Sequence, residues 1–340
     1  MDATPLFSVI IPVYNVKNYI QDTINSILSQ SCDDYEIVIV DDGSTDGSYE
    51  ICQTASLAHP EKIQLIHQPN GGVGKARNNG LRHAKGQYIS FLDSDDFLES
   101  DTLAQLKAII DRDNPDLICF DLREVPEDYH YTADTSPRKA PEAIETEALI
   151  MKKLQDPTIP CACNAFRRSL IEQHQIRFCE QLYYVEDALF FFTFVTKSHA
   201  KTILLDAPLY LYRQRQGSAV NRSFVPYRKI KTEHEGWMLV SEQLSGCSPD
   251  AISLLQARVR QVRYRLLFLF IEKYSGQEKN LSREDLAEIR SFVRKYKETA
   301  RYYQENPAIS RGKRGIFTAR CFAVSPILYN LLRKVLRKSA

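Results

Sequence analysis

The sequence predicts an α/β fold with a doubly wound, mostly parallel sheet. In the first 120 residues, short apolar runs of strand length alternate with segments whose apolar residues recur at helical spacing. Strands that alternate with helices in this way pair in parallel, because each helix carries the chain back across the sheet. After this region we expect a second αβ region and then a helical C-terminal extension.

Five strands and the helices between them are expected in order. Strand-like runs lie at residues 7–13, 35–40, 63–67, 87–92 and 116–120. Helical spacing lies between them, at residues 18–30, 46–58, 71–84 and 101–112. The alternation fails after Asp121, and residues 121–142 are polar and contain proline, so an excursion is expected there. We therefore divide the chain into residues 1–120, 121–220 and 221–340.

Composition and charge exclude some functions. The hydrophobic content of 44% and the charged content of 26% are those of an ordinary globular protein. Residues 306–340 hold eight Lys or Arg and no Asp or Glu, so the net charge of +1 hides an acidic body, which argues against nucleic acid as a partner. No apolar run approaches the ~20 residues of a transmembrane helix. We expect a cytoplasmic protein, free or peripheral on the cytoplasmic face of the membrane.

Packed carboxylates follow the fourth predicted strand, at Asp93, Asp95 and Asp96, with Ser94 between the first two. Neighbouring carboxylates raise each other's pKa, and a divalent cation with oxygen ligands is the usual compensation. If the segment is extended, Asp93 and Asp95 point to the same side. The alternative is a loop whose aspartates cap the next helix, a role open to Asp96 or Ser100.

Polar clusters also follow the first two predicted strands, at Pro12, Tyr14 and Asn15 and at Asp41 and Asp42. Because ligands bind outside the carboxyl ends of parallel strands, three elements converge on one crevice. The first loop has no Gly-x-Gly-x-x-Gly, and the Gly74-Lys75 pair lacks the Ser or Thr of an ATPase phosphate loop. The interpretation that remains is a nucleotide site in which the base stacks on Tyr14 and contacts an acidic side chain. A metal would carry the phosphates of this nucleotide.

Four motifs occur in order: Ser-Val-Ile-Ile-Pro-Val-Tyr-Asn (8–15), Val-Asp-Asp-Gly-Ser-Thr-Asp (40–46), Gly-Val-Gly-Lys-Ala-Arg-Asn (72–78) and Phe-Leu-Asp-Ser-Asp-Asp (91–96). Over about the first 220 residues the chain resembles the inverting family-2 glycosyltransferases of the GT-A fold. The resemblance implies transfer of a sugar from a nucleotide diphosphate donor, usually UDP-linked, with Mg²⁺ or Mn²⁺. It implies a donor-binding half at 1–120 and an acceptor and catalytic-base half of the same domain at 121–220.

The resemblance also implies roles for donor-binding residues. Tyr14 would stack on the uracil, Asp42 would accept a hydrogen bond from its ring N–H, and Asp41 would orient the turn, although the two acids are not separable by sequence. Arg77 would lie near the diphosphate or sugar, and its alternative is a surface salt bridge. Pro12, Asn15 and Ser94 belong to the same motifs.

The Asp-x-Asp of the family matches Asp93 and Asp95. Asp95 is the expected metal contact, and Asp93 is expected at the metal and at the donor ribose or sugar. In a similar Arg-rich loop, Arg213 and Arg215 would neutralise the departing UDP. A solvated loop is the alternative for these two arginines.

The catalytic base is expected in Tyr-Tyr-Val-Glu-Asp (183–187), which matches the family's Glu-Asp motif. Inversion needs one carboxylate to take the proton of the acceptor hydroxyl. Asp187 is the expected base and Glu186 its neighbour, with a pKa raised by the apolar setting. The alternative is that both acids only favour a helix start through the helix dipole.

Two features bear on the acceptor and the membrane. The segment 163–169, Cys-Asn-Ala-Phe-Arg-Arg-Ser, lacks the Trp and Lys of the family pattern, which leaves the acceptor class open. In the tail, residues 311–340, apolar positions share one helical face with flanking Lys and Arg. This pattern favours contact with an anionic membrane surface, and docking on the acidic body is the alternative.

The sequence therefore predicts an inverting, metal-dependent glycosyltransferase that moves a sugar from a UDP-sugar to a glycan or lipid-linked glycan acceptor, in bacterial cell-surface polysaccharide assembly. A non-catalytic nucleotide-sugar-binding or scaffold protein is one alternative. A sugar nucleotidyltransferase is another, and it would need a Gly-rich loop after the first strand, which Pro12 to Asn15 do not offer.

Overall fold

The computed structural model describes residues 4–129, 140–155, 161–215 and 227–274, with 287 and 291 as single further positions. The strands are β1 (Phe7–Val13), β2 (Tyr35–Asp41), β3 (Ile63–His67), β4 (Tyr88–Phe91), β5 (Phe97–Leu98), β6 (Leu117–Pro126), β7 (Glu142–Ile144), β8 (Asn164–Arg167) and β9 (Thr202–Gln214). The helices are α1 (Ile20–Leu28), α2 (Ser48–Ala58), α3 (Val73–His83), α4 (Thr102–Asp113), α5 (Thr146–Gln155), α6 (Arg168–Gln173), α7 (Glu186–Ser198), α8 (Tyr227–Gln243) and α9 (Pro249–Tyr274).

The strands form one mixed sheet in the order β3-β2-β1-β4-β8-β6-β9-β5, and β7 pairs with β9. β3, β2, β1 and β4 are parallel to one another, as the alternation of strands and helices predicts. β8 runs antiparallel to both of its neighbours, and β9 is parallel to β6. The predicted α/β fold on a large central sheet is thus confirmed, with antiparallel strands in its second half.

The second half differs from the predicted excursion. β6 does not end at residue 120 but continues to Pro126, with register shifts beside Asp121 where it pairs with the long strand β9. A polar stretch stays extended there because β9 supplies backbone hydrogen-bond partners from a segment far along the chain. The two-residue strand β5 is likewise held by antiparallel pairing with β9.

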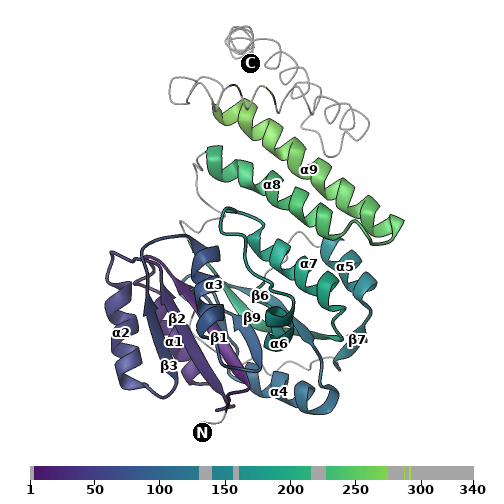
Figure 1. The fold of residues 1–340 in the computed structure, drawn as a ribbon. Helices are drawn as coiled ribbons and strands as arrows, with labels where there is room; N and C mark the ends of the chain where they lie inside the picture. Colours follow the sequence, from purple (N-terminus) through teal and green to yellow (C-terminus); the bar gives the residue numbers. More distant parts are fainter. Residues whose placement is uncertain are drawn as a thin grey trace.

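The core lies in two layers, one on each face of the sheet (Figure 1). Alternate residues of β1 point to opposite faces, so that Val9 and Ile11 pack with α1, α2 and α4 whereas Ile10 packs with α3 and α7. α3 lies very close to β1, since a Cβ on Gly80 would come within 2.3 Å of Ile10 Cγ2. This contact fixes the helix that carries Arg77 against the sheet.

Helices α8 and α9 pack above α7 and α5 (Figure 1). Buried side chains of α8 and α9, such as Trp237 and Leu255, belong to the same hydrophobic cluster as the phenylalanines of α7. In the part of the chain that the structure describes, no helix combines the length and the apolar run that crossing a bilayer requires. The basic tail at 311–340 lies outside the described residues.

Candidate active site

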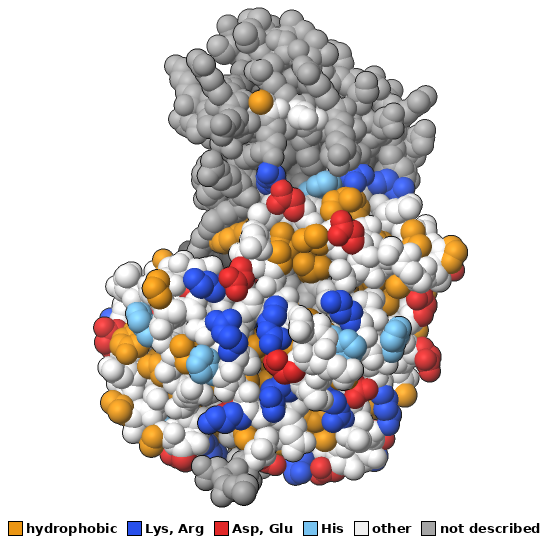
Figure 2. Space-filling model, viewed as in Figure 1, with side chains coloured by type: hydrophobic (Ala, Val, Ile, Leu, Met, Phe, Trp, Pro, Cys, Tyr) orange, Lys and Arg blue, Asp and Glu red, His pale blue; other side chains and the backbone are white. Residues whose placement is uncertain are grey.

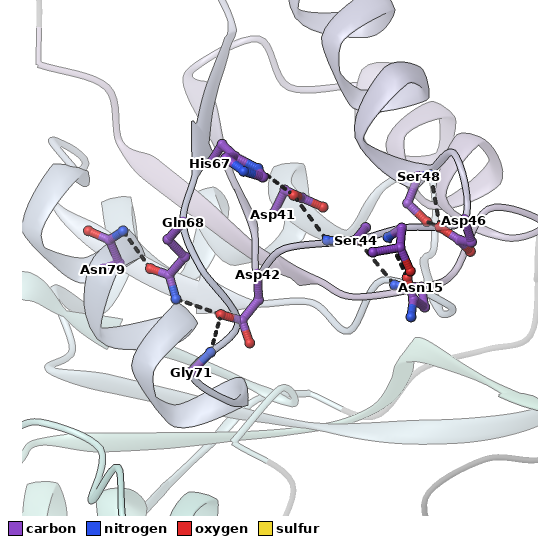
Figure 3. Close-up of polar contacts among 11 residues, drawn as sticks. Asn15, Asp41, Asp42, Ser44, Asp46, Ser48, His67, Gln68, Gly71 and Asn79 are labelled. Carbon is purple, nitrogen blue, oxygen red and sulfur yellow. Dashed lines mark hydrogen bonds and ion pairs between the residues drawn. The ribbon is translucent and has the colours of Figure 1, made fainter.

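The carboxyl ends of β1, β2 and β4 meet at one edge of the sheet because the three strands are parallel. The loop after β1 is tied to the loop after β2: the Asn15 N–H donates to Ser44 Oγ at 3.1 Å, and the Thr45 N–H donates to Asn15 Oδ1 at 2.8 Å (Figure 3). Asn15 has a φ of 52°, a left-handed conformation that asparagine tolerates well. Beside it, Tyr14 is 50% exposed, which leaves its ring available for stacking.

Asp41 and Asp42 are both buried and contact different loops (Figure 3). One oxygen of Asp41 accepts from the Ser44 N–H and contacts His67 Nδ1 at 2.8 Å, whereas Oδ1 has no partner among the described residues. Asp41 therefore holds the turn at the end of its own strand.

Asp42 organises the loop that leads into α3. Its Oδ1 accepts from Gln68 Nε2 at 2.7 Å and from the Gly71 N–H at 2.8 Å, and its Oδ2 accepts from the Gly72 N–H at 2.8 Å. Gly72, at a φ of 91°, precedes the first residue of α3. Asp42 thus sets where α3 begins, and with it the position of Arg77 one turn later.

Arg77 joins two acidic elements across the site. Its Nη2 donates to Asp93 Oδ1 at 2.9 Å and its Nη1 donates to Glu186 Oε1 at 3.0 Å. The guanidinium is buried and lies over the Phe178 ring. Burial opposes its charge, but the carboxylates of Asp93 and Glu186 outweigh burial and hold the pKa of Arg77 above its ordinary value. Arg77 therefore forms a salt bridge, which is the alternative that the sequence left open, but the salt bridge is buried and not at the surface.

Glu186 and Asp187 form the first turn of α7. Glu186 is buried against Arg77, and burial together with the Asp187 charge raises the pKa of Glu186 to about 7. Asp187 is only partly buried and accepts a hydrogen bond from the Ala188 N–H at 2.7 Å. Burial also raises the pKa of Asp187, against the opposing effect of Arg77. Of the two acids, Asp187 is the more accessible.

The residue before this pair has an unusual backbone. Val185, the N-cap of α7, has a φ of 72° and a ψ of 4°. A β-branched side chain in the left-handed region is a genuine outlier, and such strain costs on the order of 1–3 kcal/mol. The start of α7 is therefore held in place by its surroundings.

The three aspartates after β4 have three different partners. Asp93 is 40% exposed and pairs with Arg77. Asp95 pairs with Arg215. Asp96 is buried, accepts from the Tyr210 hydroxyl at 2.6 Å and accepts from the Arg213 N–H at 2.8 Å. Asp96 thus attaches the loop after β4 to β9.

Burial dominates the electrostatics of this loop. It raises the pKa of Asp95, with Arg215 opposing and Asp93 adding to the shift. Burial and the charges of Asp95 and Asp93 raise the pKa of Asp96 well above its usual range. Arg77 and Arg215 offset the charges of Asp93 and Asp95 in this loop.

Arg213 and Arg215, alternate residues at the end of β9, have different surroundings. Arg213 is buried between the rings of Phe97 and Tyr19 and pairs with Asp22 at 3.0 Å. Arg215 also lies over the Tyr19 ring, but its guanidinium reaches Asp95. Of the two guanidinium groups, that of Arg215 is therefore the one that pairs with the acidic loop.

The donor set after β4 fits a hard divalent cation in part. Asp93 and Asp95 offer carboxylate oxygens, the ligands that Mg²⁺ and Mn²⁺ prefer. Among the described residues, no group of three or more His, Cys, Asp or Glu side chains is arranged to hold a metal. The remaining ligands of a cation at Asp95 would have to come from water or from the phosphates of a bound nucleotide, and such a cation would compete with Arg215 for this carboxylate.

The sequence patterns predict which loops meet at this site, but they do not identify several of the residues that hold these loops in place. A capping role for Asp96, the alternative that the sequence leaves open, is wrong, because the Asp96 carboxylate is buried and accepts a hydrogen bond from the Tyr210 hydroxyl. The sequence does not mark Asp22, because no local pattern identifies a helix-surface acid as the partner of an arginine 191 positions away. The Arg-rich segment that contains Arg213 and Arg215 is the sequence signal that points to this region.

Residues 8–175 match the family described as Glycosyl transferase family 2. This part of the chain is a family 2 glycosyltransferase domain. A 240-residue region is 30% identical to the uncharacterized glycosyltransferase EpsJ of Bacillus subtilis and covers 68% of this chain and 66% of EpsJ. A 226-residue region is 30% identical to TarS of Staphylococcus aureus, a poly(ribitol-phosphate) β-N-acetylglucosaminyltransferase, and covers 64% of this chain but 37% of TarS. The matches thus span two thirds or less of these relatives.

Solved structures of glycosyltransferases share the fold. The crystal structure of S. aureus TarS 1-349 with UDP-GlcNAc superposes with a TM-score of 0.61 at 22% identity, covering 98% of this chain and 92% of that one. The mannosyltransferase PcManGT from Pyrobaculum calidifontis, with GDP-Man and Mn²⁺, superposes with a TM-score of 0.56 at 17% identity over 98% of this chain and 89% of that one. At these identities the likeness establishes the fold alone, which is of the GT-A type.

Proposed function

We propose that this family 2 glycosyltransferase transfers a sugar, with inversion, from a UDP-sugar to a hydroxyl of a glycan or lipid-linked glycan. The observation that carries the proposal is the hydrogen-bonded chain Asp93–Arg77–Glu186. It joins the carboxylates after β4, where a donor diphosphate would lie, to the acidic start of α7. A donor-binding element and a candidate base are thus held at a fixed separation, which in-line displacement requires.

The donor half, residues 1–120, would hold the nucleotide. The exposed Tyr14 ring would stack on the base, beside Pro12 and Asn15, and an acidic contact to the base ring would come from Asp42. Asp41 would support that turn. Arg77 lies one turn into α3, close to the loop that would face the diphosphate, and carries a positive charge that two carboxylates stabilise.

The acidic loop would hold the diphosphate end of the donor. Asp95, with Asp93, would bind Mg²⁺ or Mn²⁺, whose charge offsets that of the leaving UDP. Ser94 would help to shape this loop through its backbone, since Thr23 Oγ1 donates to its carbonyl at 3.0 Å. Once Arg215 has left Asp95, its guanidinium would neutralise the diphosphate. The buried Arg213 would fix the end of β9 from which Arg215 extends.

Asp187 would act as the base. It lies partly exposed at the start of α7, with a pKa raised by burial, so its carboxylate has the basicity to take a proton from an acceptor hydroxyl as that oxygen attacks the anomeric carbon. Glu186 would stay paired with Arg77 and contribute to the acceptor contact. Residues 121–220 would form this acceptor half of the domain.

The setting that we propose is bacterial cell-surface polysaccharide assembly at the cytoplasmic face of the membrane. Similarity to EpsJ and TarS supports this, because TarS is named for glycosylation of a poly(ribitol-phosphate) polymer. Residues 221–340 would form the helical extension, and contact with the membrane surface would come through 311–340.

The test is a thermal melt of the purified chain with UDP, with and without Mn²⁺, for the wild type and for Asp95→Asn. Ligand at about 100 times its Kd adds about 2.7 kcal/mol, which raises the midpoint by several degrees in a chain of this size. We expect a Mn²⁺-dependent rise that Asp95→Asn abolishes, followed by turnover in a screen of UDP-sugars and glycan acceptors. A rise with another nucleotide only would overturn the UDP donor. Binding of UDP without turnover of any UDP-sugar would favour a scaffold protein.

A further inference from the structure

The loop before Glu186 and Asp187 is held by helix α8, which comes from a different part of the chain. The Tyr183 N–H donates to Thr232 Oγ1 at 3.0 Å. One helical turn further along α8, Gly236 is buried against the same loop. Residues four apart lie on the same face of a helix, so Thr232 and Gly236 form one contact surface toward residues 183–185.

Gly236 marks the closest approach of the two segments. A Cβ at this position would come within 2.8 Å of Val185 Cβ and 3.2 Å of the Tyr184 carbonyl oxygen. Real Cβ atoms essentially never come as close as the first of these distances. Glycine inside a helix lowers helix stability relative to alanine, so its place in the interior of the 17-residue α8 needs a reason, and this contact supplies one.

Gly236 approaches Val185, and Val185 is the residue whose backbone is strained. Val185 has the left-handed conformation at the N-cap of α7, directly before the candidate catalytic pair. A β-branched residue stays in that conformation only where its surroundings impose it. Figure 2 shows a group of hydrophobic side chains on this face of the molecule, and buried apolar side chains of α7 and α8 belong to one hydrophobic cluster.

We propose that Thr232 and Gly236 are positioning residues for the catalytic carboxylates: α8 holds residues 183–185 in the backbone conformation that aims Asp187 at the acceptor hydroxyl. The inference rests on the proposed function, because it takes Asp187 as the base. Helix α8 lies outside the residues that match the family, and in this inference it contributes to the reaction by positioning Asp187.

The test compares Gly236→Ala and Thr232→Val with Thr232→Ser, which keeps the hydroxyl, and with Gly246→Ala. Gly246 is the matched control because a Cβ there would meet nothing within 4 Å. We expect kcat to fall about 10- to 100-fold in Gly236→Ala and Thr232→Val, since displacing a reacting group by about 1 Å costs up to 100-fold. The KM for the donor and the UDP-induced melting shift should stay unchanged. Thr232→Ser and Gly246→Ala should keep wild-type kcat.

A second readout does not need turnover. Hydrogen exchange of the Tyr183 amide should become faster in Thr232→Val, because the hydroxyl that accepts its hydrogen bond is gone, and should remain slow in Thr232→Ser. If both readouts stay at wild-type values in Thr232→Val, the inference is wrong, even if Gly236→Ala fails to fold. A third outcome is that exchange of the Tyr183 amide becomes faster in Thr232→Val while the wild type transfers no sugar. This outcome would contradict the proposed function but would establish the structural coupling of α8 to α7.

Discussion

Arg77 on α3 and Glu186 on α7 are 109 positions apart in the chain and are joined by a hydrogen bond of 3.0 Å. Through its second nitrogen, Arg77 also holds Asp93 after β4. One buried guanidinium therefore sets the distance between the two acidic elements of the site. Its removal would leave Glu186 buried without its cation.

Replacement of Arg77 by methionine should destabilise the fold. Removing one partner of a buried ion pair typically costs 3–5 kcal/mol, because the remaining charge stays out of water. We expect a loss of this size in urea unfolding of Arg77→Met. Arg112→Met is the control: Arg112 is exposed and pairs with the adjacent Asp113, and a surface pair of this kind contributes at most about 1 kcal/mol. Equal losses in the two variants would contradict the role of Arg77.

The pKa of Glu186 predicts how stability changes with pH. The folded-state pKa of about 7 lies above the ordinary value of 4.5, so between these values the folded state binds a proton that the unfolded state has lost. Stability from this group is present below pH 4.5 and is lost as pH rises through 7. At 1.36 kcal/mol per pH unit, the loss amounts to about 3 kcal/mol.

Glu186→Gln should remove this dependence, because glutamine resembles the protonated acid at every pH. Relative to wild type, the variant should gain about 3 kcal/mol between pH 4.5 and pH 8 in urea unfolding. Glu172→Gln, an exposed acid paired with Arg177, is the control and should follow wild type. A constant difference between Glu186→Gln and wild type over this range would contradict the raised pKa.

Asp187→Asn should reduce transfer without weakening nucleotide binding. A positioned general base contributes about 10²- to 10⁴-fold to the rate. We expect kcat to fall by that factor while the UDP-induced melting shift persists. Asp111→Asn, which changes an exposed acid on α4, should leave both unchanged. Wild-type turnover in Asp187→Asn would remove the assignment of the base.

Arg215 should compete with a cation for Asp95, because its guanidinium already pairs with that carboxylate. We expect Arg215→Gln to bind Mn²⁺ more tightly than wild type in the absence of nucleotide, as followed by the decrease of the free Mn²⁺ signal in electron paramagnetic resonance. Asp95→Asn should bind Mn²⁺ more weakly, and Arg177→Gln should match wild type. Weaker Mn²⁺ binding in Arg215→Gln would show that the arginine supports the metal site instead.

The sequence by itself determined the first half of the fold. β1 to β4 and the helices between them follow from apolar periodicity and from glycines at their ends, which are properties of neighbouring residues. Because parallel strands place their carboxyl ends at one edge, the same patterns also located the loops that carry Tyr14, Asp42, Asp93 and Asp95.

Only the tertiary structure decided the second half and the partners within the site. The length of β6 and the existence of β5 depend on pairing with β9, and the partners of Arg77 and Asp96 lie on α7 and β9. Likewise, α8 covers the start of α7 through a glycine that no local pattern marks. Periodicity reports which face of an element is buried, whereas these contacts depend on which distant element covers that face.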